Sequence, residues 1–279
     1  MNNADYIIDL ALNEDIGDGD HSSLSTIPQH KNGKAQLLVK ENGILAGVEI
    51  AKKVFKKVDP NLVVNVKIND GTHIQKGDIV FDVEGSAISI LSSERTVLNF
   101  MQRLSGIATS SYRVSSLLKG MHTKVLDTRK TTPGMREFEK YAVALGGCYN
   151  HRRGLWDMIM IKDNHVDYAG GITQAVKASK EYLKLKGKKL KIEVEVRNMT
   201  ELKEAIKAGI DRVMLDNFTP ENLHKAVKFV AGRIETEASG GINENNILEY
   251  AYSGVDYISM GSLTHQIKSL DLSLKAVNY

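Results

Sequence analysis

The sequence predicts an α/β protein in which an N-terminal α+β domain precedes an incomplete, open parallel β/α barrel. The chain has 279 residues, enough for one barrel or for two unequal domains. Its first 120 residues hold short strand-like segments separated by turns, whereas the residues from 123 onward alternate six strand-like segments with helical ones. Such alternation is typical of a parallel sheet joined by helical crossovers. We therefore expect an N-terminal domain over residues 1–120 and a barrel domain over residues 121–279.

The N-terminal domain is expected to open with a helix near residues 7–12. Its strand-like segments and the turns between them occupy residues 35–40, 63–68, 69–71, 76–78 and 78–85. A longer helix is expected over residues 94–118, because apolar residues recur there near helical spacing and no proline interrupts them. We include this helix in the N-terminal domain, as the link to the second half.

The barrel domain is predicted from its alternating elements. The strand-like segments are residues 123–128, 157–162, 191–196, 211–216, 234–239 and 256–260. The expected helices cover residues 134–145, 172–185 and 200–208, and two more open at Thr219-Pro220-Glu221 and Asn243-Glu244. A doubly wound sheet is the alternative arrangement of the same elements. The C-terminal tail could pack back on the N-terminal domain.

Composition excludes several classes of protein. A hydrophobic content of 42% and a charged content of 25% are those of a folded globular chain. The net charge of +3 is too small to indicate nucleic-acid binding, and no apolar run is long enough to cross a bilayer. The start lacks the basic region of a secretory leader, and the lone Cys148 cannot form an internal disulfide. We expect a cytoplasmic protein without nucleic-acid or membrane partners.

Polar, charged and glycine residues follow nearly every predicted strand. In a β/α barrel, functional groups gather where strands end. These ends are Asp127-Thr128-Arg129-Lys130, Lys162-Asp163-Asn164-His165, Glu195, Asp216-Asn217, Ser239-Gly240-Gly241 and Ser259-Met260-Gly261-Ser262. Strand alternation also places Glu193 on the same face as Glu195, and Arg212 on the same face as Asp216.

The strand ends together predict a site for a polyanion carried with a divalent cation. Residues 124–162 contain eight Lys and Arg residues and only four acidic residues. We expect Arg129, Lys130, Arg152 and Lys162 to line one side of a pocket and Glu195 and Asp216 another. Magnesium suits such a site because it binds through a few carboxylates plus substrate phosphates. The glycines of the last two loops would let backbone N–H groups approach a phosphate.

Each strand end taken singly has a structural explanation. Asp216-Asn217 could cap a helix, Ser239-Gly240-Gly241 could be only a turn, and Lys162 could pair with Asp163. Cys148 precedes His151 closely enough to suggest a thiolate pair, but a single cysteine at a helix end is more often a packing residue.

Several long motifs in one order carry a family resemblance over nearly the whole chain. They are residues 98–109, 127–143 and 146–165, followed by EVEV, MLDN, EASGGI and GVDYISMGSLTH. Together these segments resemble quinolinate phosphoribosyltransferase. The resemblance implies an open barrel behind an N-terminal α/β domain, and a homodimer or higher oligomer with shared active sites. Cys148 stands where the family pattern has glycine, and Gln266 where it has serine.

The resemblance also implies an activity: phosphoribosyl transfer from phosphoribosyl pyrophosphate to quinolinate with loss of CO2, giving nicotinate mononucleotide for NAD synthesis. By resemblance, Arg129, His151, Arg152 and Lys162 bind the two carboxylates, and Arg103 reaches in from the neighbouring subunit. Residues implied to hold phosphoribosyl pyrophosphate and its magnesium are Lys130, Glu195, Asp216, Ser239, Gly240 and Gly261. Further substrate-binding residues are expected at Thr128, Gly241, Met260 and Ser262. Lys130, Lys162, Glu195 and Asp216 would be catalytic, with Mg2+ on Glu195 and Asp216.

Three rival interpretations remain open at this level. Lys162 at a strand end could form a Schiff base, which would make the protein a lyase. The turn-rich residues 71–91 could be a lipoyl-like carrier module, although no modifiable lysine stands at a convincing hairpin tip. A related barrel protein associated with molybdenum transport shares part of the motif set.

Overall fold

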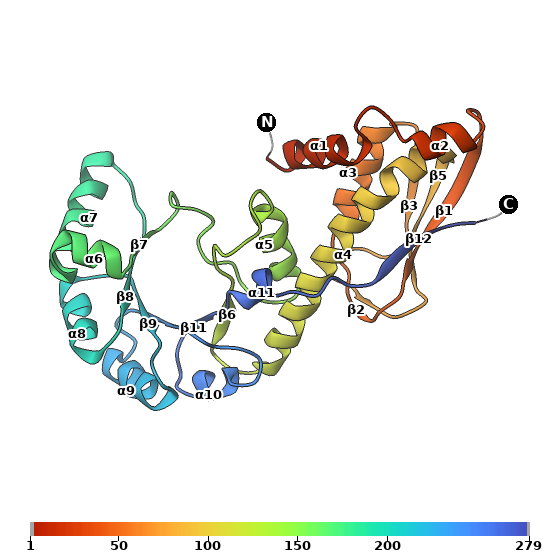
Figure 1. Cartoon of the computed structure of the whole chain (residues 1–279). Coiled ribbons are helices and arrows are strands. Elements are labelled where there is room, and N and C mark those ends of the chain that lie inside the picture. The colour runs from red at the N-terminus through yellow and green to blue at the C-terminus, as the bar shows by residue number, and fades with distance from the viewer. Residues whose placement is uncertain (1–2, 278–279) are drawn as a thin grey trace. The chain divides into compact units, whose positions relative to one another are not determined.

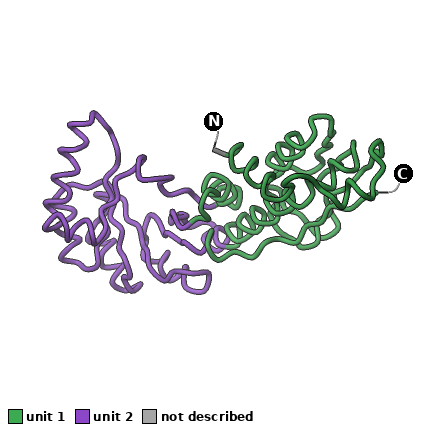
Figure 2. Tube along the Cα trace, turned by 45° about the horizontal axis from the view of Figure 1, so that its top comes forward, with its two compact units in different colours: residues 1–113, 131–147, 263–279 green, residues 114–130, 148–262 purple. Residues whose placement is uncertain are grey.

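The computed structural model describes residues 3–277, which divide into two compact units (Figures 1 and 2). Among the described residues, the first unit comprises residues 3–113, 131–147 and 263–277, and the second comprises residues 114–130 and 148–262. This division differs from the expected boundary near residue 120. Two segments assigned to the barrel by sequence join the first unit instead, because their contacts are made there.

The first unit is built around a four-stranded antiparallel sheet with the order β12-β1-β5-β3. Its strands are β1 (Asn32–Val39), β3 (Val63–Val66), β5 (Ile79–Ser86) and β12 (Leu272–Ala276), and β2 (Gly43–Ile44) pairs separately with β4 (His73–Ile74). Its helices are α1 (Asn3–Ile16), α2 (His21–Thr26), α3 (Val48–Val58), most of α4 (Ala87–Leu117), α5 (Arg136–Leu145) and most of α11 (Ser262–His265).

Alternating apolar residues build the core of this unit. Leu37 and Val39 of β1 are fully buried, and Phe55 of α3 meets Phe81 of β5 edge to face, with ring centroids 5.8 Å apart. The apolar residues that predicted the long helix are also buried; they are Val97, Met101, Leu104 and Ile107. The helix begins at Ala87, earlier than expected. Helices α2 and α3 and strands β2, β4 and β12 were not predicted.

The chain end returns to the first unit. Strand β12 pairs antiparallel with β1, so that Leu274 lies opposite Leu37. Helix α5, expected as a barrel helix, joins this unit because Glu139 accepts hydrogen bonds from Arg103 of α4. The pairing of β12 with β1 agrees with the return of the C-terminal tail that the sequence analysis allowed. The place of α5 rests on a tertiary contact between segments far apart in sequence, which strand and helix periodicity did not reveal.

The second unit is an open six-stranded parallel sheet with the order β6-β11-β10-β9-β8-β7. Its strands are β6 (Lys124–Leu126), β7 (Ile159–Ile161), β8 (Ile192–Val196), β9 (Arg212–Asp216), β10 (Glu235–Ser239) and β11 (Tyr257–Ser259). All six predicted strands are confirmed. Strands β7 to β11 are neighbours in chain order, which rules out a doubly wound sheet, and β6 and β7 form the two edges. The predicted open barrel is therefore confirmed.

Helices cover the outer face of this curved sheet (Figure 1). They are α6 (Asp163–Ala169), α7 (Ile172–Lys186), α8 (Met199–Ala208), α9 (Pro220–Val230) and α10 (Ile247–Ala251). Helix α9 starts where predicted, with Pro220 in its first turn and the Thr219 side chain accepting from the Asn222 N–H. Helix α10 starts later than predicted, and α6 was not predicted. Among residues 3–277, no helix is long and apolar enough to cross a membrane.

Candidate active site

Strand alternation in the second unit directs charged side chains onto one face of the sheet. Glu193 and Glu195 share that face on β8, Arg212 and Asp216 share it on β9, and Glu237 and Ser239 share it on β10. The strands are parallel and in register, with Glu195 opposite Met214 and Ser239 opposite Asp216. The charged side chains on this face therefore form two layers, one at the carboxyl ends of the strands and one nearer the starts of the strands.

The layer at the carboxyl ends joins Lys162, Glu195 and Asp216. Lys162 Nζ lies 2.9 Å from Glu195 Oε2, so Lys162 pairs with Glu195 and not with Asp163 as the sequence alternative had it. Burial raises the pKa of Asp216, and the negative charge of Glu195 raises it further, while Lys162 opposes both. Two carboxylates that repel each other beside one ammonium form a place where a cation is favourable.

A glycine turn closes this layer next to Asp216. Gly240 has φ +99°, and a Cβ there would lie 2.2 Å from Asn217 Oδ1, so no other residue fits without a shift. The Asn217 N–H donates to Ser239 O at 2.8 Å, which holds the β9 and β10 loops together. Gly241 also has positive φ and has open space around it.

The loops after β6 and β11 hold the remaining predicted phosphate residues. Thr128 Oγ1 accepts from the Lys130 N–H at 3.0 Å, and Lys130 is exposed. Met260 is buried, and its N–H donates to Leu126 O at 2.9 Å. Gly261 is partly exposed, and Ser262 begins the short helix α11.

Two guanidinium groups lie close together in the second unit. Burial lowers the pKa of Arg152, and the positive charge of Arg129 lowers it further. Both side chains are partly buried. Two neighbouring arginines are suited to a ligand with two carboxylates, because each guanidinium can hold one carboxylate in a bidentate fork.

His151 lies in the deeper layer and is only 7% exposed. Its Nε2 lies 3.2 Å from Glu193 Oε2 and 3.1 Å from Glu237 Oε2. Burial disfavours the charged imidazole, but the two carboxylates outweigh burial and raise the pKa of His151 to about 9. The Arg152 N–H donates to Nδ1 at 2.6 Å, so a second ring proton would have to displace that hydrogen bond. The proton on Nε2, between the carboxylates, is the one that this geometry fixes.

Sequence reasoning missed the partners of His151. Arg212 Nη1 lies 3.3 Å from Glu237 Oε2, and Asp127 Oδ1 accepts from the His151 N–H at 2.7 Å. Glu193 and Arg212 were placed on the correct face but were given no role, and Glu237 was not considered. Glu237 stands two residues before Ser239, just as Glu193 stands two residues before Glu195. This shared spacing was the signal in the sequence that could have identified Glu237.

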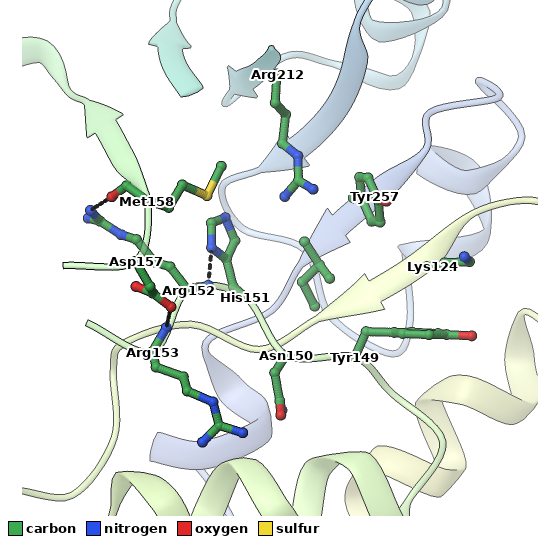
Figure 3. Close-up of a pocket in the computed structure, with 11 residues that line it drawn as sticks. Lys124, Tyr149, Asn150, His151, Arg152, Arg153, Asp157, Met158, Arg212 and Tyr257 are labelled. Atoms are coloured by element: carbon green, nitrogen blue, oxygen red, sulfur yellow. Dashed lines mark hydrogen bonds between the residues drawn. The ribbon is translucent and has the colours of Figure 1, made fainter. Parts of the chain in front are cut away.

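A pocket of about 420 Å³ opens near the starts of β6, β9 and β11 (Figure 3). It includes His151 and Arg152 among its lining residues, but not Lys162, Glu195 or Asp216. Of the other cations that line it, Lys124 lies over the Tyr149 ring, and Arg212 lies over Tyr257 and pairs with Glu235. The expected single pocket with Arg152 and Lys162 on one side and Glu195 opposite is therefore not the pocket seen here.

Arg103 belongs to the first unit and is held by a buried acid. Its Nε and Nη2 lie 2.9 Å and 2.6 Å from Glu139 Oε1, and Nη2 also donates to Thr132 Oγ1 at 2.7 Å. The Glu139 side chain has no exposed surface. Sequence reasoning did not identify Glu139 as the partner that orients Arg103.

Cys148 does not provide a nucleophile. The thiol is buried, and burial, followed by the charge of Asp127, raises its pKa to about 12. A thiol with such a pKa is protonated at neutral pH. Among the described residues, His151, Glu193 and Glu237 also offer atoms close enough to share a metal ion. Arg212 already compensates Glu237 there, so we interpret the group as an ion-pair cluster.

Family models match almost the entire chain. The model described as "Quinolinate phosphoribosyl transferase, N-terminal domain" matches residues 20–105. The model described as "Quinolinate phosphoribosyl transferase, C-terminal domain" matches residues 107–275.

Named relatives and solved structures agree with the family models. The chain is 44% identical over 261 residues to the probable nicotinate-nucleotide pyrophosphorylase [carboxylating] of Bacillus subtilis, covering 94% of this chain and 89% of the relative. It is 43% identical to quinolinate phosphoribosyltransferase [decarboxylating] 1b of Nicotiana tabacum, covering 96% and 81%. The structure of the nicotinate-nucleotide pyrophosphorylase from Francisella tularensis superposes with a TM-score of 0.93 at 40% identity, covering 99% and 96%.

Proposed function

Because the chain belongs to the quinolinate phosphoribosyltransferase family, we propose that it transfers the phosphoribosyl group of phosphoribosyl pyrophosphate to quinolinate. The products are nicotinate mononucleotide, pyrophosphate and CO2. The observation that carries the proposal is the arrangement in the second unit: Lys162, Glu195 and Asp216 meet at the strand ends, and Arg129 lies close enough to Arg152 to lower its pKa. The dicarboxylate needs the neighbouring arginines, and the phosphorylated sugar needs the charged side chains at the strand ends.

The pyridine dicarboxylate is bound by cations in this proposal. Arg129, Arg152 and Lys162 hold its carboxylates, and His151 supports them from the deeper layer. We further propose a homodimer, or a higher oligomer built from it, in which Arg103 of one subunit completes the site of the other. Glu139 fixes the Arg103 guanidinium, whose side chain remains 30% exposed, so it is oriented and still accessible.

Phosphoribosyl pyrophosphate binds along the strand ends and the glycine turn. Lys130 offers an exposed ammonium to phosphate, and residues 239–241 and 261–262 surround the phosphate with small residues. Glu195 and Asp216 fit Mg2+, because a cation relieves the repulsion that raises the pKa of Asp216. Magnesium held there, partly through substrate and water, would neutralise charge on the departing pyrophosphate.

The reaction needs no protein nucleophile. The ribose C1 bond to pyrophosphate breaks while the pyridine nitrogen bonds to C1, and the carboxylates of Glu195 and Asp216 stabilise the positive charge that develops on the sugar. The ring, now cationic, accepts the electron pair left when the adjacent carboxylate departs as CO2, and that ring carbon takes up a proton. Lys162 and the arginines hold the two anions in the reacting orientation.

A product assay tests this proposal. Purified protein is incubated with phosphoribosyl pyrophosphate, magnesium and either quinolinate or nicotinate, and nicotinate mononucleotide is followed by mass. We expect product from quinolinate alone. Product from nicotinate alone would indicate a different acceptor, and borohydride trapping of Lys162 with a carbonyl substrate would support the Schiff-base lyase instead.

We also propose that the protein works in the cytoplasm. The chain holds a single cysteine, Cys148, so it cannot form an internal disulfide, as expected in a reducing compartment. Cell fractionation with an antibody against the chain tests this location, and recovery in a membrane or extracellular fraction would contradict it.

A further inference from the structure

Four charged side chains form a buried quartet on the inner face of the second unit's sheet: His151, Glu193, Arg212 and Glu237. Each is at most 8% exposed, and the two glutamates have no exposed surface. Glu193 and Glu237 stand two residues before Glu195 and Ser239 on their strands, so the quartet lies one layer below the strand ends. The proposed chemistry uses His151 but neither glutamate.

Two buried carboxylates are expensive to retain unless each has a charged partner. Arg212 compensates Glu237 at 3.3 Å. For Glu193, the near partner is His151, whose Nε2 lies 3.2 Å away and also 3.1 Å from Glu237. The two glutamates, from β8 and β10, therefore converge on one ring nitrogen. Apolar residues of similar size would fill the space at lower cost but could not orient the ring.

The orientation of the His151 ring affects the position of Arg152 through a backbone hydrogen bond. Nδ1 of His151 accepts from the Arg152 N–H at 2.6 Å, and the His151 N–H donates to the buried Asp127 at 2.7 Å. The Arg152 N–H is thus held by the His151 ring, and the N–H of the preceding peptide is held by Asp127 in the loop directly after β6. The Arg152 guanidinium donates in turn to Met158 O at 3.2 Å (Figure 3).

We propose that Glu193 and Glu237 are positioning residues for the pyridine dicarboxylate. By holding the His151 ring from two strands, they fix the His151–Arg152 peptide and with it the direction from which the Arg152 guanidinium meets the substrate. The inference rests on the proposed function, in which Arg152 binds a quinolinate carboxylate. It extends that function to two residues that do not touch the substrate.

Glu193→Gln and Glu237→Gln test the proposal while keeping side-chain size. We expect the KM for quinolinate to rise roughly tenfold, the cost of one mismatched buried hydrogen bond. The KM for phosphoribosyl pyrophosphate and kcat should change less than about twofold, because a loss confined to one substrate's binding appears in that KM alone. Glu235→Gln is the matched control, since Glu235 also pairs with Arg212 but is partly exposed. A purely structural role would change both KM values or neither.

A double-mutant cycle tests whether the glutamates act through His151. His151→Gln with Glu193→Gln should raise the KM for quinolinate no further than His151→Gln alone. Additive effects would overturn the proposal, as would an unchanged KM in both glutamate variants.

A measurement on the wild-type protein covers the case in which the variants do not fold. Side-chain 15N NMR of His151, recorded above its pKa of about 9 so that the ring is neutral, should show a proton on Nε2 and none on Nδ1. An Nδ1–H tautomer would overturn the proposed orientation. If the wild type does not use quinolinate, the proposed function fails, whereas this NMR result still decides the geometry.

Discussion

Lys162 Nζ donates to Glu195 Oε2 at 2.9 Å, joining the end of β7 to the end of the neighbouring strand β8. In the proposed function, the pair places the cation that binds the dicarboxylate next to the carboxylate that faces the reacting sugar. It also binds the Lys162 amine to an acid, which is the opposite of the desolvated, cation-flanked lysine that a Schiff-base lyase requires.

Replacing the acid of this pair should slow the chemical step. Glu195→Gln removes the charge that stabilises the sugar in the transition state, so kcat should fall about a hundredfold, the scale seen when one preorganised electrostatic group is lost. Steady-state kinetics with both substrates measures this change. Glu201→Gln, which alters a partly exposed acid paired with Arg197, is the control and should leave kcat unchanged.

Removing either of the neighbouring arginines should weaken binding of the dicarboxylate. Arg129→Ala and Arg152→Ala each remove a charged hydrogen-bond donor, so the KM for quinolinate should rise about 10-fold to 100-fold. Arg153→Ala is the matched control, because Arg153 is the exposed neighbour of Arg152. Equal effects in all three variants would show general electrostatics and would argue against a specific site.

Variants of Arg103 test whether two subunits share each active site. Homodimers of Arg103→Ala and of Arg152→Ala should each be inactive at low quinolinate concentration. Mixing and reassembling them should restore about a quarter of wild-type activity, because half of the dimers are hybrids and half of their sites are intact. No recovery, with hybrid dimers verified by mass spectrometry, would place Arg103 and Arg152 in the site of one subunit or remove Arg103 from the site.

Cys148 should resist thiol reagents across ordinary pH. Burial raises its pKa to about 12, so the reactive thiolate is scarce in the folded protein below that pH. Reaction with a colorimetric disulfide should be slow from neutral to mildly alkaline pH and rapid after unfolding in urea. Rapid reaction of the folded protein at neutral pH would contradict this prediction and would support a reactive thiolate at Cys148.

Periodicity predicted the parts of the fold that local sequence determines. The six barrel strands were found because each carries alternating or apolar residues between helical segments, and α9 because Thr219 and Pro220 mark its start. The unit boundary was not predictable in this way. Residues 131–147 and 263–277 join the first unit through a side-chain pair, Arg103 with Glu139, and a strand pairing, β12 with β1.

In the candidate site, too, some contacts could be predicted from the sequence and others could not. Lys162, Glu195 and Asp216 stand at strand ends, where a parallel sheet brings side chains together, so their proximity followed from topology. The proximity within the quartet around His151 did not, because Glu193 and Glu237 come from strands that are not adjacent and both approach the ring of a loop residue, while Arg212 of the intervening strand pairs with Glu237. No spacing in the sequence relates His151 to these strands.

The most direct test of the account uses quinolinate labelled with 13C in the carboxylate next to the ring nitrogen. Wild-type protein with phosphoribosyl pyrophosphate and magnesium should release labelled CO2, pyrophosphate and unlabelled nicotinate mononucleotide in equal amounts. Pyrophosphate release without labelled CO2, or no turnover by protein shown to be folded, would contradict the assigned function.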